Sequence, residues 1–157
     1  MSGTVDDDAR VRMKTLQCAA IDLGATSGRV IVGGWDGRRL VLTEVHRFAN
    51  GFHGLGGHDY WDLPRLWSEI RAGLVEARRR FPKLVSVGID TWCVDHVLTN
   101  ERGREVFPLH AYRDPRTQPG LNRLAHTRRA LERIYAATGI PNVFYNTSLQ
   151  LAETEIG

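Results

Sequence analysis

The eight residues from Asp22 to Arg29 combine one carboxylate, two glycines, two hydroxyls and one guanidinium, which suits them to bind a phosphate. Glycines let a backbone turn sharply and approach an anion, and successive N–H groups in such a turn form a nest for phosphate oxygens. The hydroxyls of Thr26 and Ser27 would add donors, and Arg29 would add positive charge. Asp22 could hold Mg²⁺ through water, because Mg²⁺ keeps much of its hydration shell. An ordinary hairpin with a glycine turn is the alternative interpretation.

A second group of polar residues, Asp90, Trp92 and Asp95, lies where one predicted strand ends and the next begins. Carboxylates accept hydrogen bonds from sugar hydroxyls, and an indole ring offers an apolar face to the C–H surface of a sugar. The alternative is a buried pair of strands with capped turns. Asp90 fits that alternative less well, since an unpaired buried carboxylate is costly.

The remaining reactive side chains predict no further site. His53 and His58 share a glycine-rich segment, Asn50 to His58, with no carboxylate or cysteine at ligand spacing. We therefore expect a loop with solvated histidines. Cys18 and Cys93 form no CxxC pair, and we expect two buried thiols in a reducing cytoplasm.

These groups must be positioned by strands and one helix. Apolar runs predict strands over Leu16 to Leu23 and Arg29 to Trp35, followed by an Asp36-Gly37 hairpin turn. The side chains from Leu40 to Phe48 are expected to alternate between the two sides of a third strand. Those on one side are Leu40, Leu42, Glu44, His46 and Phe48. Three strands joined by tight turns predict an antiparallel meander.

The clearest helix is predicted over Asp62 to Phe81, with Asp62 as its cap and Pro64 in its first turn. Its buried stripe is expected to contain Leu63, Leu66, Trp67, Ile70, Leu74 and Ala77. Strands over Leu84 to Asp90 and Val94 to Leu98 should follow, and then a turn at Asn100 to Gly103. Beyond a loop at Arg113 to Gly120, helices are expected over Leu121 to Thr138, ended by Gly139, and over Thr147 to Ile156.

Six segments, in order from Leu16 to the C-terminus, resemble the FGGY family of carbohydrate kinases. They are AIDLGATSGRV, EVHRFANG, the WDL helix start, SVGIDTWCVD, AYRDPRT and ATGI…NTSLQL. The resemblance implies an α/β fold of the ribonuclease H-like, actin-like ATPase type, with a mixed sheet. It also implies ATP-dependent phosphorylation of a sugar in a cleft between two domains. L-Rhamnulose, phosphorylated at its 1-hydroxyl, is the expected substrate, and another ketose or a polyol is the alternative.

Carried over by position, the resemblance assigns the ATP phosphates to a loop made of Ala25, Thr26, Ser27, Gly28 and Arg29. It assigns Mg²⁺ to Asp22 and a backbone contact with the sugar to Cys93, which joins Asp90, Trp92 and Asp95 in the expected sugar site. Cys93 stands where the family usually has a small residue, often glycine, whose backbone contacts the sugar. Phe144 to Asn146 also departs from the family pattern, in a loop that faces the substrate.

The resemblance places the general-base aspartate and the adenosine-binding second domain beyond Gly157. We therefore expect residues 16–157 to form a truncated N-terminal domain that is inactive alone, after a disordered extension over residues 1–15. A non-catalytic module that binds a sugar or a partner is the alternative. The chain of 157 residues is 42% hydrophobic with a net charge of +3, its arginines are scattered, and no apolar run could cross a bilayer. Nucleic-acid and membrane partners are not expected.

Overall fold

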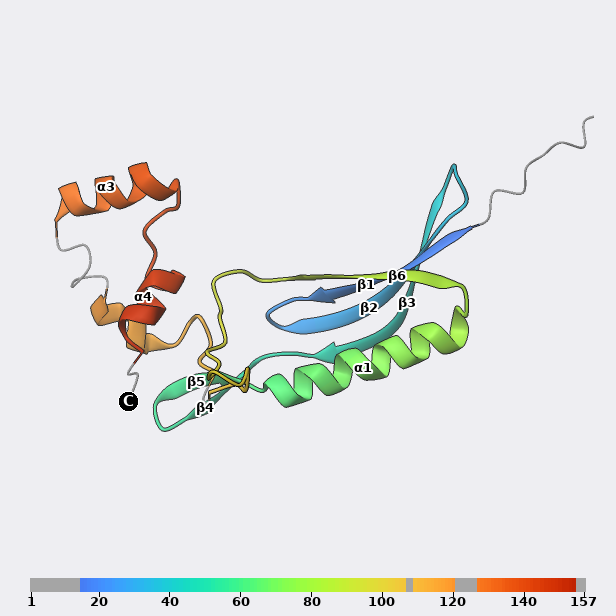
Figure 1. The fold of residues 1–157 in the computed structure, drawn as a ribbon, viewed down its shortest axis with the longest axis horizontal. Coiled ribbons are helices and arrows are strands. Elements are labelled where there is room, and N and C mark those ends of the chain that lie inside the picture. The colour runs from blue at the N-terminus through green and yellow to red at the C-terminus, as the bar shows by residue number, and fades with distance from the viewer. Residues whose placement is uncertain (1–14, 107–108, 121–126, 155–157) are drawn as a thin grey trace, which may run out of the picture. The chain divides into compact units, whose positions relative to one another are not determined.

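The computed structural model describes residues 15–106, 109–120 and 127–154, which form two compact units (Figure 1). The first unit contains a four-stranded sheet with the order β3-β2-β1-β6 and most of helix α1. The second contains a two-stranded sheet, β4-β5, and the helices that follow β6. The expected extension over residues 1–15 lies almost wholly outside the described residues.

The predicted antiparallel meander is confirmed. β1 (Leu16–Leu23) pairs with β2 (Ser27–Trp35), and β2 pairs with β3 (Leu40–Ala49), all antiparallel. The Asp36 carboxylate accepts hydrogen bonds from the N–H groups of Arg38 and Arg39, at 2.8 Å each, and closes the β2–β3 hairpin. The apolar runs and the Asp36-Gly37 pair, which are local signals, therefore predicted these strands and this turn correctly.

The predicted alternation of β3 is wrong in its middle. His46 pairs with Val30 whereas Glu44 pairs with Ile31, so a bulge at Val45 interrupts the register. One extra residue on one strand moves the side chains before it to the opposite face. Leu40, Leu42 and Glu44 therefore lie on one face of the sheet, and His46 and Phe48 on the other.

Helix α1 (Leu63–Arg80) begins at its predicted cap, where the Asp62 carboxylate accepts a hydrogen bond from the N–H of Arg65 at 2.9 Å. In the first unit its buried stripe packs against β2, with Gly73 against Val30. Trp67 was expected in this stripe but is 58% exposed. The buried residues Leu66, Ile70, Gly73 and Ala77 follow a 4, 3, 4 spacing that leaves Trp67 outside the face.

The core of the first unit lies between α1 and one face of the sheet. Buried residues from β1 pair directly with buried residues from β2, as Ala19 does with Val32 and Ile21 with Val30. β6 (Leu84–Thr91) forms one edge of the described sheet, and Val85, Val87 and Ile89 are more than half exposed there. The expected apolar strand is therefore present, but it is not a buried one.

In the second unit, the segment expected to be a loop is a hairpin of β4 (Phe52–Leu55) and β5 (His58–Trp61). Gly56 and Gly57 form its two-residue turn with φ of 62° and 84°. Two positive φ angles define the turn that suits the twist of a hairpin, and glycine adopts them without strain. The sequence therefore carried the hairpin signal in its Gly-Gly pair.

The strand expected over Val94 to Leu98 is absent, although the turn at Asn100 is present and is flanked by a bridge between Thr99 and Glu105. A short 3-10 helix, η1 (Pro115–Thr117), lies within the expected loop. The long helix expected over Leu121 to Thr138 is described only as α3 (Arg128–Thr138), because residues 121–126 lie outside the described ranges.

Helix α3 starts at Thr127, whose hydroxyl accepts a hydrogen bond from the N–H of Ala130, and ends at Gly139 as expected. Helix α4 (Thr147–Ala152) begins where it was predicted and is shorter than expected. Among the residues placed by the structure, no helix has the length and apolar character needed to cross a bilayer.

Candidate functional site

The predicted phosphate loop lies between β1 and β2, with Asp22 and Arg29 on its two flanks. The two residues are partners in the strand register, and Nη2 of Arg29 lies 2.5 Å from Oδ2 of Asp22. Their side chains are 39% and 38% exposed. Paired residues of antiparallel strands share one face of the sheet. Arg29 therefore compensates the charge of Asp22, and both groups remain accessible on that face.

A second ion pair extends this charged region along β3. Arg47 is the register partner of Arg29, and its guanidinium donates to both carboxylate oxygens of Glu44 at 2.6 and 2.9 Å. The hydrogen bonds from Arg47 lower the pKa of Glu44, which keeps the carboxylate charged. The first unit thus carries two carboxylates and two guanidiniums on neighbouring strands.

The turn from Gly24 to Thr26 is held by Asn50, for which the sequence predicted no role in the site. The amide nitrogen of the Asn50 side chain donates to the carbonyl of Gly24 at 2.8 Å, and its backbone N–H donates to the carbonyl of Thr26 at 3.0 Å. Two bonds from one residue fix both ends of the turn. The signal for this role was weak, because Asn50 stands 24 residues beyond the loop that it holds.

The second predicted group is partly brought together, around a carboxylate held by two indoles. Nε1 of Trp92 and Nε1 of Trp61 both donate to Oδ2 of Asp95, at 2.6 and 2.7 Å. The two rings are stacked with centroids 4.3 Å apart. Trp61 was missed by sequence reasoning, which treated the residues before α1 only as a helix start.

The chemistry of Asp95 follows from its burial. Burial raises the pKa of the Asp95 carboxyl, and the hydrogen bonds from Trp92 and Trp61 oppose that rise. Its second oxygen, Oδ1, is buried and has no hydrogen-bond partner among the described residues. An unpaired buried acceptor is costly unless a ligand or water satisfies it. Oδ1 is therefore an acceptor without a partner, which an enclosed water or a ligand hydroxyl would satisfy while both indoles hold Oδ2.

The chain between these residues adopts a strained turn. Val94 has a φ of 74°, and it is the only residue other than glycine with positive φ among those described. A β-branched residue is a clear outlier in this region, and such strain is concentrated at functional sites. Its carbonyl accepts from the hydroxyl of Thr147 at 2.6 Å and from the side-chain amide of the buried Gln150 at 3.1 Å. Helix α4 thus stabilises the turn that carries Trp92 and Asp95.

The other predicted residues belong to different units or are more open than expected. Asp90 is exposed in β6 of the first unit, whereas Trp92, Cys93 and Asp95 belong to the second. The expectation of two buried thiols is wrong, since Cys93 is exposed and Cys18 is half-buried. Cys18 lies on the sheet face opposite α1, and Cys93 precedes the residue with positive φ in the strained turn.

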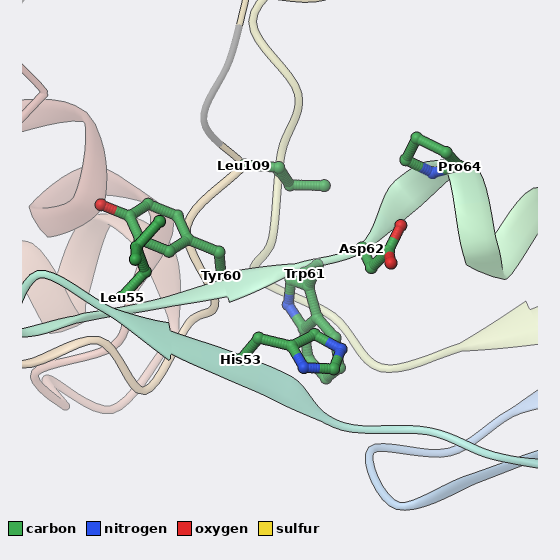
Figure 2. Close-up of a pocket in the computed structure, with 7 residues that line it drawn as sticks. All are labelled: His53, Leu55, Tyr60, Trp61, Asp62, Pro64 and Leu109. Carbon is green, nitrogen blue, oxygen red and sulfur yellow. The ribbon is translucent and has the colours of Figure 1, made fainter.

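A cavity of about 480 Å³ also opens in the second unit (Figure 2). Its lining residues come from the β4–β5 hairpin, the start of α1 and the segment after residue 108, and they are His53, Leu55, Tyr60, Trp61, Asp62, Pro64 and Leu109. Trp61 contributes to this cavity and also donates to Asp95. The cavity was not predicted because the hairpin that forms one wall was interpreted as a loop.

Comparison with curated proteins links the chain to one group of enzymes. It is 43% identical over 141 residues to a rhamnulokinase of Mannheimia succiniciproducens and 42% identical over 136 residues to a rhamnulokinase of Bacillus subtilis. These matches cover 88% and 87% of this chain, but only 29% and 28% of the relatives, in their N-terminal part. The chain therefore spans less than a third of the length of these relatives. No protein-family model matches it.

Solved structures give the same fold at low identity. A gluconate kinase from Lactobacillus acidophilus superposes with a TM-score of 0.72 at 12% identity, over 89% of this chain and 28% of the kinase. A xylulose kinase from the same species gives a TM-score of 0.71 at 13% identity, over 87% and 28%. At these identities the likeness establishes the fold, which is the expected ribonuclease H-like, actin-like ATPase fold with a mixed sheet.

Proposed function

Because the chain matches the N-terminal part of the FGGY carbohydrate kinases in sequence and in fold, we propose that the protein containing it phosphorylates a sugar with ATP. The observation that supports this most is the loop between β1 and β2, flanked by Asp22 and Arg29 on one face of the sheet. Phosphoryl transfer depends on positioning and charge neutralisation more than on covalent chemistry. A turn of small residues beside one anion and one cation provides both.

In this proposal the residues from Ala25 to Arg29 hold the phosphates of ATP. Nε of Arg29 is buried without a hydrogen-bond partner among the described residues, so rotation of the side chain toward a phosphate would give this donor a partner. Asn50 keeps the turn in shape before any ligand arrives, so less ordering is needed on binding. When bound, ATP supplies the phosphoryl group and Mg²⁺ neutralises its charge.

Asp22 is proposed to hold Mg²⁺ through water. Its carboxylate is accessible, and its ion pair with Arg29 fixes its orientation on the sheet. Arg29 then has two roles, since it balances Asp22 in the free protein and can turn toward a phosphate in the complex. An anion near Arg29 would also weaken its attraction to Asp22, which frees the carboxylate for the water shell of the metal.

The sugar is proposed to contact Asp90, Trp92, Cys93 and Asp95. The unpartnered Oδ1 of Asp95 is the acceptor best suited to a hydroxyl, because two indoles already fix the carboxylate. One face of the Trp92 ring is stacked on Trp61, so only the opposite face remains for a sugar. Cys93 is exposed, so a ligand can reach this residue even though it carries a side chain.

The proposed substrate is L-rhamnulose, converted to L-rhamnulose 1-phosphate in the cytoplasm. The support is the identity of 42–43% to rhamnulokinases over most of this chain. The alternative is another ketose or a polyol, because Cys93 and the segment from Phe144 to Asn146 differ from the family pattern. A remnant that binds a sugar or a partner without turnover is the remaining alternative for the 157 residues alone.

A coupled assay of ADP release by the full-length protein tests the proposal. We expect release with MgATP and L-rhamnulose, and weaker or no release with other ketoses and with polyols. Residues 1–157 assayed alone serve as the control and should give no turnover, because the general base is expected outside them. If no sugar in the panel stimulates ADP release, the kinase proposal is wrong.

A further inference from the structure

The structure brings His58, His110 and Asp114 together at the start of β5, outside the residues assigned to ATP or sugar. One ligand atom from each of the three lies within 4.8 Å of the others. Nδ1 of His58 lies 3.2 Å from Oδ2 and 3.3 Å from Oδ1 of Asp114, and the two imidazole rings are 5.5 Å apart, edge to face. The carboxylate that contacts His58 thus comes from Asp114, 56 residues further along the chain.

Backbone pairing holds the three residues in place. The N–H of Trp61 donates to the carbonyl of Leu109 at 2.9 Å, and the N–H of Ala111 donates to the carbonyl of Asp59 at 2.8 Å. These two bonds flank the bridge between Tyr60 and His110, which fixes His110 beside β5. The N–H of Asp114 then donates to the carbonyl of Ala111 at 2.9 Å. The group is therefore built from rigid elements, as a binding site requires.

The carboxylate of Asp114 is oriented but keeps capacity for a ligand. The side chain is fully buried; Oδ2 accepts from the N–H of Asp59 at 2.7 Å and Oδ1 from the N–H of Arg116 at 2.9 Å. The guanidinium of Arg116 lies 3.4 Å from Oδ1. Each oxygen has a further lone pair, and both now face the Nδ1 of His58. A metal ion placed between Nδ1 of His58 and the Asp114 carboxylate would use these lone pairs. The backbone hydrogen bonds to Asp114 would stay in place.

We propose that His58, His110 and Asp114 form a binding site for a divalent transition-metal ion of the Zn²⁺ type. Two imidazoles and one carboxylate suit such an ion, whereas Mg²⁺ prefers oxygen ligands alone. A tetrahedral ion with bonds of about 2 Å separates its ligand atoms by about 3.3 Å, so small side-chain rotations close the site. His58 is 43% exposed, which lets the ion enter and leaves a fourth position for water. The ion would join the β4–β5 hairpin to η1.

The test uses metal-free protein without a histidine tag, titrated with Co²⁺ and then with Zn²⁺ as competitor. We expect the visible absorption of tetrahedral Co²⁺ to saturate at one equivalent and to disappear as Zn²⁺ is added. His58→Ala and His110→Ala should each weaken Co²⁺ binding at least about tenfold. His53→Ala removes an exposed histidine from the same hairpin and should leave the affinity unchanged.

Far-UV circular dichroism of the metal-free variants separates loss of the site from loss of the fold. His58 lies partly in solvent, so His58→Ala should leave the protein folded. If His110→Ala unfolds, His58→Ala alone is sufficient to test the proposed metal site. The proposal is overturned if the wild-type protein shows no saturable Co²⁺ band. It is also overturned if folded His58→Ala binds Co²⁺ as tightly as the wild type. Neither outcome depends on sugar phosphorylation, because the readout is metal binding.

Discussion

Gly28 lies directly beneath the ring of Phe48, its register partner across β2 and β3. A Cβ added at Gly28 would collide with three atoms of that ring. Gly28 was predicted to belong to the phosphate loop, because glycine lets the backbone approach an anion. The packing gives the same glycine a second requirement, since Phe48 is 7% exposed and belongs to the core of the first unit.

Gly28→Ala should therefore destabilise the fold, even without any ligand. Overpacking of a core typically costs about 1–3 kcal/mol, and urea denaturation would measure the loss. Gly88→Ala is the matched control, because an added Cβ at Gly88 in β6 meets nothing within 4 Å. The control should change the free energy of unfolding by less than about 0.5 kcal/mol. Equal losses in both variants would mean that the contact with Phe48 is unimportant.

Asn50→Asp should weaken ATP binding by the full-length protein more than it affects stability. The replacement removes the donor to the carbonyl of Gly24 and places a negative charge near the proposed phosphate loop. One lost hydrogen bond costs about 0.5–1.5 kcal/mol of stability. Asn50→Ala removes the donor without adding charge, so nucleotide titration of both variants separates the two effects. If ATP affinity is unchanged in both variants, the contact of Asn50 with the loop has no role in ATP binding.

Asp22→Asn in the full-length protein should lower turnover strongly and stability only slightly. The pair with Arg29 is more than a third exposed, and such pairs contribute about 0–1 kcal/mol to stability. Loss of charge beside the transferring phosphate should reduce kcat by about 10²-fold or more. Glu44→Gln is the control, because it removes a comparably exposed carboxylate that pairs with Arg47. A normal kcat for Asp22→Asn at saturating Mg²⁺ would exclude Asp22 from the metal site.

Asp95→Asn should keep or increase stability at neutral pH, whereas Asp95→Leu should lower it. The amide oxygen of Asn can accept from both indoles without the charge, but Leu leaves the buried N–H of Trp61 unpaired, at a cost of about 1–3 kcal/mol. Because folding raises the pKa of Asp95, its contribution is greatest below its ordinary pKa and is lost as pH rises through the folded pKa. In thermal melts between about pH 3 and pH 7, the melting temperature of Asp95→Asn should therefore rise relative to that of the wild type as the pH increases. If Asp95→Asn instead became more stable relative to the wild type as the pH falls, the raised pKa of Asp95 would be contradicted.

Val94→Gly should relieve the strain of the turn before Asp95. A non-glycine residue held at positive φ costs about 1–3 kcal/mol, so the variant should be no less stable than the wild type despite losing its side chain. Val97→Gly provides the control, since Val97 has no positive φ and should lose stability through added chain entropy. Comparison of denaturation midpoints tests this prediction. A larger loss at Val94 than at Val97 would show that the turn is not strained.

The sequence by itself determined the elements whose signals are local. The bounds of β1 and the start of α1 at Asp62 were predicted to the residue, and the hairpin at Asp36-Gly37 was predicted with its turn. Apolar runs, a capping carboxylate and a turn pair each act within a few residues of chain. The resemblance to sugar kinases was also visible in the sequence, because it depends on the order of short motifs.

Tertiary structure decided which distant residues meet. Asp95 acquires Trp61 from the end of β5, and His58 acquires Asp114 from 56 residues away. The bulge at Val45 and the positive φ of Val94 likewise depend on partners elsewhere, in β2 and in α4. Periodicity describes one segment at a time, whereas pairing, burial and unsatisfied polar atoms are properties of two segments together. The chemistry of Asp95 and of the proposed metal site could therefore be read only from the fold.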